Sequence, residues 1–258
     1  MTGNRRVGLN VQERDRHLLR ELGTMRVIDR EQAEIVTGFR STRRANRRLV
    51  ALVRASLLRR IFIPNPAIGQ KALYTLSPKG AALVSARLAG LPLRQSRFGP
   101  SPFLLHRLAI NGFYLTLKYR PLPGADMRLA RWISFREPLT PAIPLTPDGY
   151  FEILFGDHTR AMFLEVDLGT ESSLIWQKKT QLYVQMALSG VCNELFRQPQ
   201  FRVLVIATTA RRLQHIRAAV AKFTDKIFWL STFEEIQQLG FWAPVWLRPA
   251  GDQRLPLI

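Results

Sequence analysis

The spacing of apolar residues predicts three short helices at the start of the chain. In "VQERDRHLLREL" (residues 11–22) the apolar side chains recur at helical spacing and form one stripe that can be buried. "DREQAEIVTG" predicts a second helix, with Asp29 as its N-cap and Gly38 as its end. In "STRRANRRLVALVRAS" the apolar residues share one side, which predicts a third helix with a basic outer face.

A β-hairpin is predicted directly after these helices. Two runs, at about 57–63 and 71–76, are rich in strand-forming residues, and the loop between them contains Pro, Asn and Gly. A further helix then begins with Ser77 as its cap and Pro78 in its first turn. Three helices followed by a hairpin is the element order of a winged helix-turn-helix domain, which we place at residues 1–95.

A second domain is predicted at residues 96–258. The segment "LRQSRFGPSPF" (residues 93–103) is rich in Pro, Gly and Ser and predicts a linker. The patterns after it predict a helix, three strands, a helix, a strand, a helix, a strand and a short helix. This order is typical of a mixed sheet flanked by helices, so we expect an α/β fold class, α+β over the whole chain.

The charge distribution favours nucleic acid as the partner. The chain carries a formal net charge of +19, and sixteen Lys and Arg but no acidic residue lie between Glu34 and Asp126. Such a stretch is drawn strongly to a phosphate backbone. An anionic membrane surface is the competing partner, but the basic segments lack the broad apolar face that inserts into a bilayer. With no apolar N-terminal stretch and a single cysteine, Cys192, we expect a cytoplasmic protein that binds double-stranded DNA and no membrane.

The third predicted helix and the hairpin supply the expected DNA contacts. Arg and Asn can pair bidentately with guanine and adenine in the major groove, and further basic side chains can contact phosphate. The expected contact residues are Ser41, Thr42, Arg43, Arg44, Asn46, Arg47, Arg48, Arg59, Arg60 and Lys71. A charged, solvated helix and a protein-binding winged helix are the alternative interpretations.

Carboxylates gather in one stretch of this basic chain. Residues 146–172, "TPDGYFEILFGDHTRAMFLEVDLGTES", hold six acidic side chains. Alternation along a strand places Glu165 and Asp167 on one face, and a hairpin turn at "GDHTR" brings Asp148 close to Asp167 on the partner strand. Acids that face a polyanion repel it unless a cation lies between them. We therefore predict a site for Mg²⁺ or Mn²⁺ with Asp148, Glu165 and Asp167 as ligands.

The same stretch resembles the signature of the PD-(D/E)XK nucleases, the restriction-endonuclease-like fold. "PDG" followed by "EVD" after a hairpin resembles their motif, and the predicted element order matches their core. The family pattern has a lysine where this chain has Asp167, so Lys178 or Lys179 on the following helix would supply the cation. The resemblance implies that the catalytic residues are Asp148, Glu165, Asp167, Lys178 and Lys179.

The whole chain resembles the replication-relaxation family, winged-helix proteins of plasmids and integrative elements. The resemblance rests on "RDRHLLRELGTMRVIDREQAEIV", "STRRANRRLVALVRASLLRRI", "YTLSPKGAALV", "HRLAINGFY", "PDGYF", "FLEVDLGTES" and "FWAPVWLRP". It implies a role in replication or mobilisation, either with DNA nicking by the C-terminal domain or as a non-catalytic autorepressor or accessory factor. In the second case a decayed nuclease-like domain would serve dimerisation or docking. The implied protein partners are a second copy of the chain and proteins of the replication or transfer apparatus.

Two other chemistries are disfavoured by the sequence. The histidines His17, His106, His158 and His215 are far apart, without the tight cluster that relaxases of the histidine type use for their metal. The chain has no glycine loop of the G-x-x-x-x-G-K-[ST] kind, so we expect no ATP-driven work.

Overall fold

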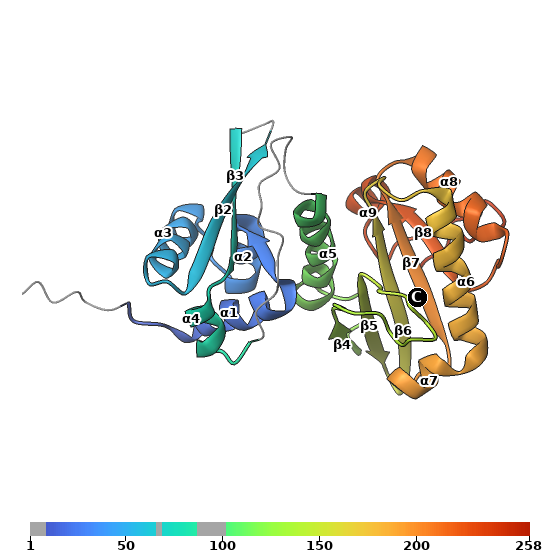
Figure 1. The fold of residues 1–258 in the computed structure, drawn as a ribbon, viewed down its shortest axis with the longest axis horizontal. Coiled ribbons are helices and arrows are strands. Elements are labelled where there is room, and N and C mark those ends of the chain that lie inside the picture. Colours follow the sequence, from blue (N-terminus) through green and yellow to red (C-terminus); the bar gives the residue numbers. More distant parts are fainter. Residues whose placement is uncertain (1–8, 66–68, 87–101) are drawn as a thin grey trace, which may run out of the picture. The chain divides into compact units, whose positions relative to one another are not determined.

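The computed structural model describes residues 9–65, 69–86 and 102–258 of the chain. The chain divides into two compact units, Met1–Arg120 and Pro121–Ile258 (Figure 1). The boundary expected at 95/96, and most of the linker expected at 93–103, lie outside the described residues. The helix after this linker, which was expected to begin the second domain, belongs to the first unit instead.

The first unit contains a three-stranded antiparallel sheet and five helices among its described residues. The strand order is β1-β3-β2. Its elements are α1 (Glu13–Met25), β1 (Val27–Asp29), α2 (Arg30–Thr37), α3 (Thr42–Arg54), β2 (Leu58–Asn65), β3 (Gly69–Leu76), α4 (Pro78–Leu83) and α5 (Pro102–Tyr119). The three helices and the hairpin expected from the sequence are present, and the short strand β1 is an addition to them.

The last helix of the first unit, α5, is fastened to it by buried polar contacts. Asn111 donates two hydrogen bonds from its amide nitrogen, to the carbonyl oxygens of Met25 (3.1 Å) and Val27 (2.6 Å). Tyr114 donates a hydrogen bond from its hydroxyl to Glu21 on α1 at 2.6 Å. Because these groups are buried, each would be costly to leave unpaired, which explains why α5 belongs to this unit.

Local capping chemistry fixes where the short helices begin and end. Asp29 accepts a hydrogen bond from the backbone N–H of Gln32 at 2.8 Å, and Ser77 accepts one from Gly80 at 2.9 Å. Gly38 ends α2 with a left-handed φ of 67°, a conformation that glycine adopts without a steric cost. Ser41 stands at the N-cap position of α3, but its side chain makes no capping hydrogen bond.

The second unit is built on a five-stranded mixed sheet in the order β4-β5-β6-β7-β8. Strands β4, β5 and β6 pair antiparallel, whereas β6, β7 and β8 pair parallel. The elements are β4 (Met127–Ile133), β5 (Gly149–Phe155), β6 (His158–Asp167), α6 (Ser173–Ser189), α7 (Val191–Phe196), β7 (Phe201–Ala207), α8 (Ala210–Ala221), β8 (Phe228–Thr232) and α9 (Phe233–Leu239). The predicted α/β class is confirmed, with α7 as an unpredicted element.

Aromatic side chains form the core between this sheet and its helices. Figure 1 shows α6 and α8 beside each other on one side of the sheet. Phe163 of β6 packs against Tyr183 of α6, with 5.6 Å between the ring centroids. On the opposite face, Phe241 of the segment after α9 packs against Phe151 of β5, with 6.5 Å between the ring centroids, and Trp246 of this segment is fully buried. No helix in the described part of the chain is long and apolar enough to cross a membrane.

Candidate nucleic-acid interface and carboxylate site

The outer face of α3 presents polar and basic side chains to solvent. Its inner residues Ala45, Leu49 and Leu52 are buried, and their spacing turns the other side of the helix outward. The side chains exposed on the first two turns are Thr42, Arg43, Arg44, Asn46 and Arg47. Five of the ten residues predicted to contact DNA therefore share one exposed helical surface, which we name the α3 face.

Two of the residues expected to contact DNA form ion pairs inside the first unit. Arg48 donates from Nε to Asp15 on α1 at 2.8 Å, and the hydrogen bond to this acid raises the pKa of Arg48. Lys71 forms an ion pair with Asp29 at 2.6 Å. Because both cations have a buried carboxylate as partner, they join elements of the unit, and the structure does not place them with the α3 face.

The remaining expected contacts lie beside α3 and on the hairpin. Ser41, half-buried, precedes the α3 face. Arg59 and Arg60 are exposed on β2, and alternation directs them to opposite faces of the small sheet. The guanidinium of Arg60 lies 4.9 Å from the ring centroid of Phe62, which is itself 40% exposed. This strand thus adds two cations that are open to solvent.

The register of the β5–β6 hairpin determines which carboxylates meet. The ladder ends at the pair Gly149–Leu164, which puts Asp148 beside Glu165 and not next to Asp167, where the sequence had suggested it would lie. Asp148 accepts a hydrogen bond from the backbone N–H of Val166 at 2.7 Å. The structure therefore brings Asp148 and Glu165 together, and Asp167 lies two residues further along β6 than Glu165.

Glu165 lies at the centre of a buried cluster. Both of its oxygens are engaged: Lys179 donates to Oε2 at 2.9 Å and the Tyr183 hydroxyl donates to Oε1 at 2.6 Å. Burial raises the pKa of Glu165 to about 7, the charge of Lys179 opposes this shift, and the nearby Asp148 adds to it. Glu165 is thus a carboxyl group that exchanges its proton near neutral pH.

Of the two lysines named from the sequence, Lys179 is the one that contacts this cluster. Its Nζ lies 2.9 Å from Glu165 and 2.7 Å from Glu171, and the charges of Glu165, Glu171 and Asp148 raise its pKa against the effect of burial. Lys178, the other candidate, is exposed on α6. The cluster around Glu165 therefore contains Lys179 but not Lys178. It also contains Glu171, which the sequence analysis did not single out.

Asp167 belongs to a separate ion pair. Arg212 of α8 donates to both of its oxygens, at 2.7 and 2.6 Å. The Trp176 ring N–H and the Gly169 backbone N–H supply two more hydrogen bonds, and all of these lower the pKa of Asp167 although burial acts the other way. A carboxylate has about four acceptor positions, so this one has none left for a metal ion. Among the described residues no group of three His, Cys, Asp or Glu is arranged to hold a metal.

The sequence model of one protein family, described as Replication-relaxation, matches residues 19–197. The chain belongs to the replication-relaxation family. The match runs from α1 to the end of α7 and so includes both the α3 face and the Glu165–Lys179 cluster. Membership connects the protein with replication or mobilisation. No curated protein and no solved structure matches the chain.

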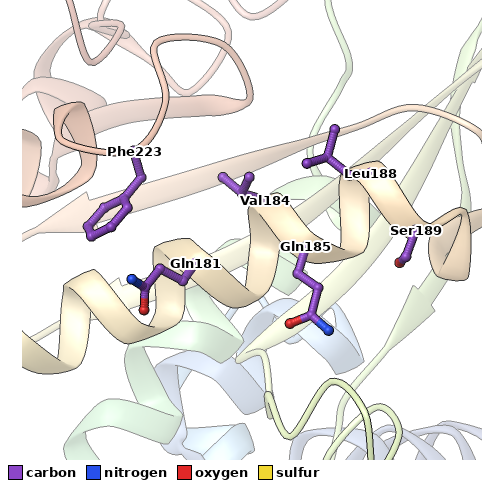
Figure 2. Close-up of a pocket in the computed structure, with 6 residues that line it drawn as sticks. All are labelled: Gln181, Val184, Gln185, Leu188, Ser189 and Phe223. Atoms are coloured by element: carbon purple, nitrogen blue, oxygen red, sulfur yellow. The ribbon is translucent and has the colours of Figure 1, made fainter.

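A hollow of about 490 Å³ lies on the outer side of α6 in this replication-relaxation protein. Figure 2 shows its lining side chains, which come from α6 except for Phe223 after α8. They are Gln181, Val184, Gln185, Leu188, Ser189 and Phe223. The lining has no ionisable group and shares no residue with the Glu165–Lys179 cluster, so this hollow is not a candidate for metal or phosphate chemistry.

The raised pKa of Glu165 predicts how the stability of the second unit depends on pH. The group titrates near 4.5 when unfolded and near 7 when folded, so its stabilising contribution is complete below about 4.5 and is lost as pH rises through 7. Between pH 5 and 8 we expect the free energy of unfolding to fall by about 2–3 kcal/mol more in the wild type than in Glu165→Gln.

Tryptophan fluorescence during urea unfolding measures this difference, because all five tryptophans follow residue 120 and report the second unit. The two proteins differ only at residue 165, so the comparison isolates the contribution of this carboxyl group. Parallel pH profiles for the wild type and Glu165→Gln would contradict the assignment of a neutral-range pKa to Glu165.

Proposed function

We propose that this protein binds double-stranded DNA and acts in the replication or mobilisation of a bacterial plasmid or integrative element. In this proposal the first unit is a winged-helix domain that reads DNA with α3. The observation that carries the proposal is the α3 face, where Arg43, Arg44, Asn46 and Arg47 are exposed together.

The geometry of α3 suits a major groove. The groove admits one α-helix, and the residues that reach base edges come from the first turns of such a helix. Arg43 and Arg47 are four residues apart and so lie on the same side of α3, and Asn46 lies one turn from Arg43. The exposed Arg59 of β2 extends the positive surface to the hairpin, which corresponds to the wing.

Fluorescence anisotropy with a labelled duplex from the native origin region tests this proposal. For the double variant Arg43→Ala, Arg47→Ala we expect the affinity for DNA to fall by about 100-fold. The slope of log affinity against log salt concentration should also decrease by the equivalent of about two phosphate contacts. Arg20→Ala is the matched control, because Arg20 is an exposed arginine of α1 that pairs with Glu13. Equal affinity of the double variant and the control would overturn the role of α3.

A second activity, metal-dependent DNA nicking, is favoured by the cluster around Glu165. The residues fit one divalent ion only with a different ligand set from the one predicted: Asp148 lies beside Glu165, whereas both oxygens of Asp167 accept hydrogen bonds from Arg212. Glu171 pairs with Lys179 and is not counted as a ligand. Asp148 and Glu165 would hold Mg²⁺ or Mn²⁺, which takes one or two carboxylates and keeps its waters for chemistry.

In this proposal the residues of the second unit have distinct tasks. Lys179 places a positive charge beside Glu165, where it can stabilise the charge that builds up on a phosphate group during cleavage. Tyr183 is fully buried and donates a hydrogen bond from its hydroxyl to Glu165, so it orients this carboxylate and is not an accessible nucleophile. A non-catalytic accessory factor is the competing function, and in that case Lys179 is a permanent substitute for the ion.

A further inference from the structure

A row of basic and aromatic side chains crosses the sheet of the second unit on the face opposite α6. Arg160 lies on β6, Arg202 on β7 and Trp229 on β8, and the strand pairing with its alternation directs all three to this face. The bridge between residues 230 and 247 continues the ladder and sets Arg248 beside Trp229. Four neighbouring segments thus contribute one side chain each.

The ring of Trp229 is packed by two of these arginines. The guanidinium carbon of Arg202 lies 4.3 Å from the ring centroid, and that of Arg248 lies 4.8 Å from it. The tryptophan is only 7% exposed, and its ring N–H has no hydrogen-bond partner among the described residues. The buried Nε of Arg160 likewise has none there. Buried donors without an acceptor are rare in folded proteins, so this row offers two donors to an acceptor from outside.

The charges in the row are poorly compensated. Burial lowers the pKa of Arg202 to about 10, and the positive charges of Arg160 and Arg248 add to this effect. Arg202 donates to the carbonyl oxygen of Leu257, a neutral group, and Arg248 donates to the backbone oxygen of Asp225 at 3.0 Å. Asp225 is also the acidic neighbour of Arg248. An anion with several acceptor oxygens would relieve the repulsion among the three guanidinium groups.

We propose that Arg160, Arg202 and Arg248 form a binding site for a phosphate group. Guanidinium groups match phosphate oxygens in shape and charge, and the row presents three of them on a rigid sheet. The site is distinct from the Glu165–Lys179 cluster, because Arg160 and Glu165 point to opposite faces. Five residues along β6 also separate them, which is roughly 16 Å at the usual rise of a strand.

Two sources can supply this phosphate, and one experiment separates them. A phosphate of the DNA backbone would make the row a second DNA contact, which rests on the proposed DNA binding. A free phosphate or a small phosphorylated molecule would bind whether or not the protein binds DNA. Thermal unfolding of the full chain is therefore followed by tryptophan fluorescence in sodium phosphate and in sodium chloride of equal ionic strength, and duplex binding is measured in parallel.

The variants are Arg160→Gln, with Arg248→Gln as a second probe, and the matched control is Arg128→Gln, an exposed arginine on β4. We expect phosphate at about 100 times its Kd to raise the melting temperature of the wild type and the control by roughly 5–10 °C relative to chloride. We expect this rise to shrink by more than half in Arg160→Gln and Arg248→Gln.

If the phosphate comes from DNA, Arg160→Gln should also reduce the slope of log affinity for the duplex against log salt concentration by the equivalent of about one phosphate contact. Arg128→Gln should leave this slope unchanged. Unchanged duplex binding, together with the loss of the phosphate effect, assigns the site to free phosphate or a small phosphorylated molecule. An equal phosphate effect in the wild type and both row variants overturns the site. If the α3 variants bind DNA normally while the row variants lose the phosphate effect, the proposed DNA-reading helix fails and the phosphate site stands.

Discussion

Replacing Arg212 by Leu is expected to lower the free energy of unfolding of the second unit by about 3–5 kcal/mol. The carboxylate of Asp167 has no exposed side-chain surface, and Arg212 supplies two of its four hydrogen bonds. Removing the arginine leaves a buried charge with only Trp176 and Gly169 as donors. The midpoint of urea unfolding, followed by tryptophan fluorescence, measures the loss.

Two further variants show that this loss comes from the pair. Arg211→Leu changes the preceding, exposed residue of α8, and we expect it to alter stability by less than about 0.5 kcal/mol. Asp167→Asn combined with Arg212→Leu removes the buried charge along with its partner, so the double variant should be more stable than Arg212→Leu alone. If Arg212→Leu proves no less stable than Arg211→Leu, the structural role of Asp167 is refuted.

The elements that could be predicted from the sequence are those whose own residues carry a local signal, such as a helix cap or an apolar run. The helices α2 and α4 follow from their caps, and the strands β6 and β7 from their apolar runs. The missed elements are β1, with three residues, and α7, with six, which are too short to show a period. The place of α5 depends on Asn111 bonding residues more than eighty positions earlier, and no local pattern contains that information.

For the candidate site, the alternation of side chains along a strand predicted which residues of β6 share a face, but not which residues of other elements they meet. Glu165 and Asp167 do share one face of β6, since both bond to side chains of α6. Alternation says nothing about register, so Asp148 was expected near Asp167, whereas the observed pairing brings it beside Glu165. Arg212 was missed because its contact arises where β6 and β7 end side by side, with Asp167 opposite Ala207. Knowledge of that parallel pairing would have indicated that residues just after β7 meet Asp167.

Replacing Lys179 by Met is expected to reduce metal-dependent nicking of a supercoiled origin plasmid by about 100- to 1,000-fold. Lys179 supplies the positive charge nearest to Glu165, and without it the buried carboxyl group holds its proton more tightly. Lys178→Met is the matched control, because this neighbouring lysine is exposed and we expect its loss to leave nicking unchanged. The assay follows conversion of supercoiled plasmid to open circles with Mg²⁺ or Mn²⁺.

Binding and folding readouts separate the outcomes of this experiment. The α3 face lies in the first unit, so Lys179→Met should bind the origin duplex as the wild type does, and tryptophan fluorescence reports whether the second unit remains folded. Nicking that survives in Lys179→Met but fails in Lys178→Met would show that the wrong lysine had been chosen. A wild type that binds DNA but does not nick would favour the accessory factor, since an ammonium group held at 2.9 and 2.7 Å by two glutamates already supplies the cation that these acids require. In that case removing Lys179 should increase the affinity for Mn²⁺, because the carboxylates would lose the charge that now neutralises them.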